Sequence, residues 1–293
     1  MLSMGLKKRK EWVRPLLEES LLSFIYMVAM NLIVWNCRGT LKPNFQDYVH
    51  DLVRQHDLAI FVVIETHIGG ARARDITEKL PFDGAIHTET IGRAEGLWLL
   101  WNFDKVDVSF LASLEQEIHS TVKVLSSNFN WMFFAVYASS RSAERRILWN
   151  NLSNVADLHK MPWVITGDFN EPLTSADKFG GRVVSVNRAL AFKDCLDKCN
   201  MVDLGFSGPR FTWTNGREIQ DLIQEMIDRF FVNPDLYLIY PNARVTYLTR
   251  CHSDHCPVLL ETMPQRRIHL DCPFKFQRYW LSNLSFLKVV SQA

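Results

Sequence analysis

Residues 58–66, with the sequence LAIFVVIET, limit the possible folds more than any other segment. The first seven of these nine residues are apolar without alternation, and a glutamate and a threonine follow. Such a run is typical of a strand buried on both faces. Further strand-like runs occur at 31–36, 96–102, 105–111, 131–138, 163–170, 210–216, 226–232, 243–249 and 256–261.

Amphipathic segments separate some of these runs and predict helices. At 44–57, apolar residues recur with helical spacing from Phe45 to Val53. A second helix is expected over 142–159 with Ile147, Leu148, Leu152 and Val155 on one buried stripe, and a third over 187–199. Many other connections are too short for a crossover helix, so a mixed α/β arrangement fits better than a purely parallel sheet.

Composition places the chain among ordinary globular proteins. It has 293 residues, of which 47% are hydrophobic and 22% charged, and a formal net charge of +1. The balanced charge gives no global field for nucleic acid, although a local basic patch would be hidden in this sum. The six cysteines are sparse, so reduced thiols are expected. The segment 251–256, CHSDHC, matches no usual paired-ligand spacing for zinc.

The two ends of the chain differ in composition from the middle. We expect residues 1–29 to be a leader of uncertain role, 30–263 to be the folded domain, and 264–293 to be a tail or the start of a linker. The basic run at 7–10 precedes an apolar stretch that is interrupted by Asn31 and is short for a bilayer span. We therefore expect no stable membrane association and a nuclear or cytoplasmic location.

Polar side chains stand at the ends of several predicted strands. One run ends at Asn36, the next at Glu65, and a third at Tyr137. In the segment 163–170, WVITGDFN, residues two apart on an extended chain face the same side. Asp168 and Asn170 should therefore share one face, with the intervening phenylalanine directed into the core. Each residue taken singly also has a plain structural reading as a turn or solvated residue.

Three more polar residues lie in the last third of the chain. Asp228 opens one strand-like run, and Asp254 and His255 precede another. The combined set matches what metal-assisted hydrolysis of a phosphoester requires, namely hard oxygen ligands, a base for water, and groups that stabilise negative charge. The sequence contains neither a Gly-Lys phosphate loop nor a GxSxG nucleophile elbow.

The motifs occur in the order WNCRG, ET, VY, GDFN, FTWTN, IDRFF and SDHCP. This ordered set resembles the endonuclease/exonuclease/phosphatase superfamily, and more narrowly the apurinic-type endonuclease domain of plant LINE-type (non-LTR) retrotransposons. EGLWLLW, DKFGGR and FSGPRFTWTNGR support the narrower resemblance. It covers about residues 30–263 and implies a four-layer α/β/β/α sandwich with its site where strand termini converge.

The resemblance also implies a magnesium ion, or manganese in its place, and assigns roles around it. Glu65 resembles the metal-binding glutamate, Asp254 a second acid near the metal, and Asn36 an amide that contacts the metal or phosphate. Asp168 resembles the base that deprotonates the attacking water. His255, oriented by Asp228, resembles the group that binds the phosphate.

Further substrate contacts follow from the same resemblance. Asn170 and Tyr137 correspond to groups that hold the scissile phosphate, and Thr212 to an additional DNA or phosphate contact. Arg38 stands where many superfamily members carry an acid, and we take it as a substrate-binding residue whose charge could alter metal affinity.

The implied function is magnesium-dependent nicking of duplex DNA. Two alternatives stay open at this point. One is a phosphatase or phosphodiesterase acting on a small molecule, a lipid or an RNA phosphoester. The other is an inactive retrotransposon-derived remnant, which the absence of a Tyr-x-Asp-Asp polymerase motif leaves possible.

Overall fold

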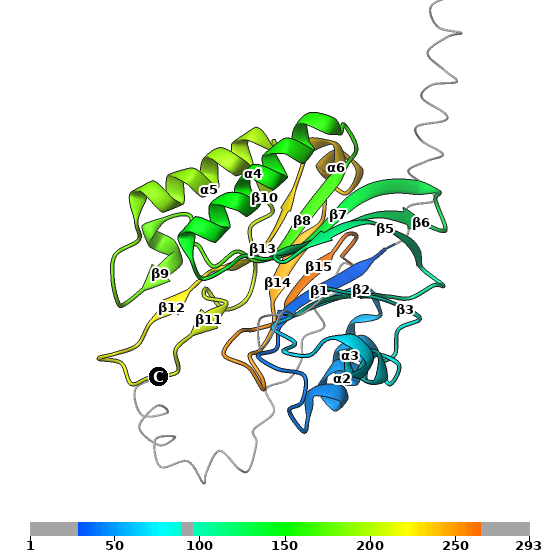
Figure 1. Cartoon of the computed structure of the whole chain (residues 1–293), viewed down its shortest axis with the longest axis horizontal. Helices are drawn as coiled ribbons and strands as arrows, with labels where there is room; N and C mark the ends of the chain where they lie inside the picture. Colours follow the sequence, from blue (N-terminus) through cyan, green and yellow to red (C-terminus); the bar gives the residue numbers. More distant parts are fainter. Residues whose placement is uncertain (1–28, 89–95, 265–293) are drawn as a thin grey trace, which may run out of the picture.

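The computed structural model describes residues 29–88 and 96–264, and these form two facing β-sheets covered by helices (Figure 1). The predicted leader (1–29) and tail (264–293) lie almost wholly outside the described residues. No helix in the described ranges has both the length and the apolar character needed to cross a membrane.

The first sheet has six strands in the order β14-β15-β1-β2-β4-β3. The strands are β1 (Asn31–Asn36), β2 (Leu58–Ile64), β3 (Gly84–His87), β4 (Leu97–Trp101), β14 (Arg244–Tyr247) and β15 (Val258–Glu261). Only β1 and β2 pair in parallel, and the other neighbours are antiparallel. Every residue of β2 is buried, as its continuous apolar sequence predicted.

The second sheet also has six strands, in the order β10-β13-β8-β7-β6-β5. The strands are β5 (Val106–Leu114), β6 (Glu117–Val124), β7 (Phe129–Tyr137), β8 (Trp163–Asp168), β10 (Val202–Asp203) and β13 (Asp228–Val232). Here β7 and β8 form the parallel pair. A small third sheet joins β9 (Lys178–Phe179), β11 (Trp213–Thr214) and β12 (Gln224–Glu225).

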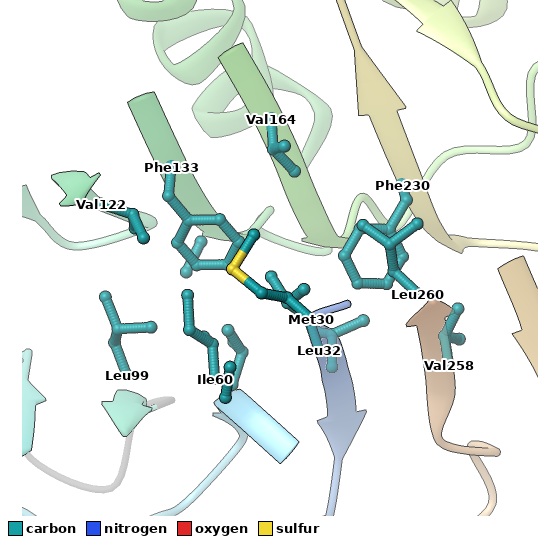
Figure 2. Close-up of a cluster of buried hydrophobic side chains, with 14 of the residues drawn as sticks. Met30, Leu32, Ile60, Leu99, Val122, Phe133, Val164, Phe230, Val258 and Leu260 are labelled. Carbon is teal, nitrogen blue, oxygen red and sulfur yellow. The ribbon is translucent and has the colours of Figure 1, made fainter. Parts of the chain in front are cut away.

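The main core lies between the two large sheets (Figure 2). Leu32 and Ile60 from the first sheet meet Phe133, Val164 and Phe230 from the second, and all five are almost fully buried. Burial of such side chains contributes about 1.5–3 kcal/mol each. This interface is what holds the strand ends of one sheet against those of the other.

Helices cover the outer face of each sheet (Figure 1). The first sheet is covered by α2 (Phe45–His56) and α3 (Gly70–Thr77), and the second by α4 (Ser142–Leu158) and α5 (Val186–Lys198), with α6 (Pro234–Ile239) beside the latter strands. The predicted α/β/β/α sandwich is therefore confirmed.

Several local predictions differ from the structure. Ile147 is 59% exposed, so it does not belong to the buried stripe of α4, which is formed by Leu148, Trp149 and Leu152. The strand predicted over 210–216 is limited to Trp213–Thr214. The sequence did not predict the longer elements α3, β3, β6 and α6, nor the short pieces β9, β10, β12 and the 3-10 helix Ser175–Asp177. In β6 the buried positions include Glu117, His119 and Ser120, and these polar residues obscure its strand character in the sequence.

Candidate active site

Strand register brings the predicted polar residues to one edge of the sandwich. In the first sheet Asn36 pairs with Ile64, which immediately precedes Glu65. In the second sheet Tyr137 pairs with Asp168, and Asp168 pairs on its other side with Asp228. The two parallel pairs end on the same side of the sandwich. The four predicted site residues at their ends, Asn36, Glu65, Tyr137 and Asp168, therefore converge without any long loop.

Asn36 joins the two sheets at this edge. Its side-chain Nδ2 donates hydrogen bonds to Glu65 Oε1 at 2.9 Å and to Asp168 Oδ2 at 3.0 Å. The side chain is fully buried, so both hydrogen bonds lie in a low-dielectric environment. Tyr137 adds a third anchor, since its hydroxyl donates to Glu65 Oε1 at 2.9 Å. Glu65 Oε1 therefore accepts two hydrogen bonds, whereas Oε2 lies 3.4 Å from Arg38 Nε.

Asp168 has both carboxylate oxygens held by amides. Oδ2 accepts from Asn36, and Oδ1 accepts from the backbone N–H of Asn170 at 2.9 Å. Asn170 has a left-handed backbone with φ of 47°, which ends the strand, and its Nδ2 donates to the carbonyl of Ala138 at 2.8 Å. Phe169 is fully buried in the hydrophobic cluster between the second sheet and the helices α4 and α5. The prediction that its side chain points into the core is therefore confirmed.

Burial shifts the protonation of this carboxylate. It raises the pKa of Asp168 to about 7, with the negative charge of Asp228 as the second cause, while His255 and the Asn36 hydrogen bond act in the opposite direction. The group is thus poised to exchange a proton near neutral pH, as a general base should be.

His255 lies between two aspartates. Its Nδ1 is 2.9 Å from Asp228 Oδ2, and its Nε2 is 3.8 Å from Asp168 Oδ2. Burial alone would lower the pKa of His255, but the charges of Asp228, Asp168 and Asp254 together raise it to about 9. At neutral pH the ring is therefore an imidazolium whose orientation is set by Asp228.

Asp254 occupies the outer part of the site. Its Oδ2 accepts a hydrogen bond from Trp213 Nε1 at 2.9 Å, and its Oδ1 lies 3.5 Å from Arg38 Nε. The same Arg38 atom lies 3.4 Å from Glu65 Oε2. The guanidinium thus bridges the two acids that the sequence predicted as metal neighbours.

Thr212 lies beneath the site and away from its surface. The side chain is fully buried, and its hydroxyl accepts hydrogen bonds from the backbone N–H groups of Ile227 and Asp228 at 3.0 and 3.1 Å. In the structure this hydroxyl holds the start of β13, and the substrate contact expected from Thr212 stays a prediction.

Sequence reasoning missed His67 and Trp213. His67 Nε2 is 3.6 Å from Glu65 Oε2, and Trp213 donates to Asp254 as described above. Both side chains line the same cavity as Glu65. The spacing ETH places His67 two residues beyond Glu65, but both residues have positive φ (56° and 53°), so strand alternation could not predict where the imidazole lies.

The residues surround a cavity of about 630 Å³. Its lining consists of Arg38, Glu65, His67, Tyr137, Ser140, Asn170, Trp213, Glu225, Ile227 and His255. A second hollow of about 210 Å³ shares Ser140, Asn170 and Glu225 with the first, and is bordered by Arg145, Lys178 and Arg188. The two hollows adjoin at these shared residues, and the cationic residues of the second are paired with carboxylates, Arg145 and Arg188 with Glu171 and Lys178 with Glu225.

One set of His, Cys, Asp and Glu side chains in the described ranges could hold a metal ion. It consists of Glu65, Asp168 and His255, whose ligand atoms lie within 4.8 Å of one another. The metal neighbours implied by the sequence were Glu65, Asp254 and Asn36. Glu65 is common to both sets, Asn36 bridges Glu65 to Asp168, and Asp254 connects to Glu65 through Arg38.

The cysteines within 29–88 and 96–264 contribute no metal or redox centre to this site. The five that the structure describes are free thiols. Burial raises the pKa of Cys37 and of Cys256 to about 12, so both remain protonated. Cys256 belongs to the main core and His255 is directed at Asp228, which separates the two residues of the CHSDHC segment that a zinc site would need.

Comparison with solved structures supports the architecture. The AP endonuclease LMAP from Leishmania major has a TM-score of 0.65 and 13% identity, covering 81% of this chain and 88% of the other. The endonuclease domain of TRAS1, a telomere-specific non-LTR retrotransposon, has a TM-score of 0.61 and 13% identity, covering 81% and 100%. The 3′ phosphatase NExo from Neisseria, bound to a product DNA hairpin, has a TM-score of 0.59 and 18% identity, covering 79% and 98%.

A search of curated protein sequences gave no match. Residues 33–255 match the sequence pattern of a known family, and this range contains every residue of the site described above. It also contains all the strands of both large sheets except the first two residues of β1 and the whole of β15. The chain therefore belongs to the Endonuclease/Exonuclease/phosphatase family.

Proposed function

We propose that this protein is a magnesium-dependent endonuclease that nicks duplex DNA, as the endonucleases of LINE-type retrotransposons do. The observation that carries the proposal is the position of Asp168, a buried carboxylate held by two amides and facing an imidazolium across 3.8 Å. A base and a cation this close together can act on one reaction centre, the base on the attacking water and the cation on a phosphate oxygen.

Asp168 is the proposed base. Its pKa of about 7 lets the carboxylate accept a proton from water at neutral pH, and the hydrogen bonds from Asn36 and Asn170 fix its orientation. Fixed orientation matters because in-line attack requires the water oxygen to lie opposite the leaving group.

His255 is the proposed phosphate-binding group. With Nδ1 occupied by Asp228, its Nε2–H is the remaining donor, and it points toward the cavity that also contains Asn170 and Tyr137. An imidazolium there would stabilise the charge that develops on the phosphate oxygens. Asn170 and Tyr137 would supply further polar contacts to the same group.

The donor set fits a hard divalent cation. Glu65 would hold the metal through Oε2, because Oε1 already accepts hydrogen bonds from Asn36 and Tyr137. His255 carries a proton at neutral pH, so it is less suited to ligate a metal than the carboxylates beside it. A bound Mg²⁺ or Mn²⁺ would supply charge neutralisation at the phosphate and at the leaving oxygen.

The shape of the two adjoining hollows favours a polymeric substrate over a small phosphoester. A small ligand is normally enclosed on most sides, whereas here the catalytic cavity continues past Ser140 and Asn170 into a hollow bordered by Arg145, Lys178 and Arg188. A nucleic acid strand carries phosphates on both sides of the cleaved one, and Arg188 at the second hollow, whose side chain is 45% exposed, could contact one of them.

The test is nicking of supercoiled plasmid by purified protein in Mg²⁺. We expect wild type to convert supercoiled to open-circular DNA, and Asp168→Asn to lose at least about a thousandfold in rate because the base is removed. Asp194→Asn, which removes an exposed carboxylate on α5, is the matched control and should nick like wild type. Nicking by Asp168→Asn at the wild-type rate would refute the assignment.

The same assay separates the alternatives. A protein that leaves plasmid intact but releases phosphate from a 3′-phosphorylated oligonucleotide or a sugar phosphate would be a phosphatase of the same family. A folded protein that does neither in Mg²⁺ or Mn²⁺ would be an inactive remnant.

A further inference from the structure

Arg38 places a positive charge between the two outer acids of the site. Its Nε lies 3.4 Å from Glu65 Oε2 and 3.5 Å from Asp254 Oδ1. Glu65 Oε1 is already used by Asn36 and Tyr137, so Oε2 is the atom on which a metal ion and Arg38 would compete. The guanidinium thus neutralises the same carboxylate oxygen that the proposed function assigns to the metal.

Hydrogen bonds hold the backbone at Arg38 in place, whereas its side chain is about half exposed. The residue has a left-handed φ of 52°, and the turn is held by hydrogen bonds from Cys37 N to the carbonyl of Ile64 at 3.0 Å and from Gly39 N to that of Glu65 at 2.8 Å. Ser253 Oγ donates to the carbonyl of Asn36 at 2.7 Å. The Arg38 side chain itself is 48% exposed and lines the catalytic cavity.

We propose that Arg38 is a displaceable cation. In the metal-free protein it neutralises Glu65 and Asp254; when a divalent cation binds Glu65, electrostatic repulsion turns the guanidinium toward the cavity, where it binds a phosphate of the substrate. A planar guanidinium can bind a phosphate through two parallel hydrogen bonds, which suits it to this second role. This inference rests on the proposed function, because it takes the metal and a phosphodiester substrate from it.

Metal binding tests the first half. We expect Arg38→Gln to bind Mn²⁺ roughly tenfold more tightly than wild type in calorimetric titrations at low salt, because a unit charge a few ångströms from a divalent ion is removed. Arg54→Gln removes an exposed arginine that pairs with Asp51 on α2 and should bind Mn²⁺ like wild type. Glu65→Gln should lose most binding. Equal or weaker binding of Mn²⁺ by Arg38→Gln would overturn the proposal.

Substrate binding tests the second half. In Ca²⁺, a fluorescein-labelled 20-base-pair duplex should bind Arg38→Gln about tenfold more weakly than Arg54→Gln, by anisotropy. Arg38→Lys keeps the charge without the paired donors, so it should bind Mn²⁺ like wild type but the duplex more weakly. Undiminished duplex binding by Arg38→Gln would overturn the second role.

The two halves fail in distinguishable ways. If wild type itself binds no duplex, the DNA substrate of the proposed function is wrong, and inorganic phosphate replaces the duplex as the probe of Arg38. The Mn²⁺ titration does not depend on the substrate, and its result decides the displacement in either case.

Discussion

His255 and Asp228 form a buried pair in which Nδ1 of the imidazole lies 2.9 Å from a carboxylate oxygen. Both side chains are at most 3% exposed. The pair lies on separate elements 27 residues apart, since Asp228 begins β13 and His255 precedes β15, so it also links the two large sheets. Its consequence is an imidazole that keeps its proton above neutral pH and presents it toward the cavity.

Replacing Asp228 should therefore shift the alkaline limb of the reaction. In Asp228→Asn the carboxylate that most strongly raises the pKa of His255 is gone, so the decline in nicking rate should move from near pH 9 to lower pH. At neutral pH we expect a loss of about 10- to 100-fold, as for other groups that orient a catalytic partner. A pH series of single-turnover nicking rates measures both effects. An unchanged pH profile would contradict the orienting role.

The stability of the metal-free protein should fall as pH rises. The folded-state pKa of His255, about 9, is above its ordinary value, so its contribution is complete below about pH 6.5 and is lost through pH 9. The raised pKa of Asp168 acts in the same direction between about pH 4 and 7. Urea unfolding in chelator at pH 7 and pH 9 should show a decrease of about 3 kcal/mol or less from the histidine.

The histidine contribution can be isolated in an Asp168→Asn background, where residue 168 no longer titrates. Adding His255→Gln should flatten the decrease between pH 7 and pH 9. His159→Gln, on the exposed end of α4, is the matched control and should leave the slope unchanged. A slope that survives the His255 substitution would show that another group causes it.

The buried pair Arg145–Glu171 should be essential for stability. The side chains are 2% and 1% exposed and form an ion pair, and Arg145 also donates to the carbonyls of Ser139 and Ser140 at 2.7 and 2.9 Å. Arg145→Ala leaves Glu171 buried, with only the longer contact to Arg188 at 3.5 Å. We expect unfolding free energy to fall by about 3–5 kcal/mol in chemical denaturation. Arg146→Ala, on the neighbouring exposed position of α4, should cost under about 0.5 kcal/mol. Equal effects would refute the structural role.

Gly167 should tolerate no side chain. Its φ is 150°, and a Cβ atom built on it would lie 1.8 Å from the carbonyl oxygen of Val136, its partner in the parallel pair of β7 and β8. Gly167→Ala should therefore separate the strands that carry Tyr137 and Asp168, lowering unfolding free energy by more than about 2 kcal/mol and nicking along with it. Gly216→Ala also has positive φ but open space, and should cost less. A thermal melt of both variants makes the comparison.

Much of the fold could be predicted from local pattern. The apolar run of β2 is continuous, and the apolar residues of α2 recur with helical spacing. Both elements and their buried residues could therefore be predicted from the local pattern. The same reasoning failed for β6, because this strand buries polar residues, among them Glu117, which pairs with His119 inside the protein. Ile147 shows a second limit, because a helical stripe is broader than the face that neighbouring elements cover.

The site divides in a similar way. The residues Glu65, Asp168, Asn170, Asp228 and His255 follow from motif order. Glu65 and Asp168 stand at the ends of parallel pairs, Asp228 pairs with Asp168 at the start of the antiparallel strand β13, and His255 contacts Asp228. Thr212 and His67 could not be placed in this way. A hydroxyl can serve a ligand or the backbone equally well, and a residue with positive φ escapes the alternation on which strand reasoning depends.

By itself the sequence determined most of the core strands and the longer helices, which of their ends carry polar groups, and the family to which the chain belongs. Only the tertiary structure decided the state of those groups. It raised the pKa values of Asp168 and His255, let Asn36 bridge two carboxylates, and placed Arg38 between Glu65 and Asp254. Each of these features depends on residues from different strands or loops. These features arise from burial and from short distances between side chains. Both exist only when strands that are far apart in the sequence pack around one core.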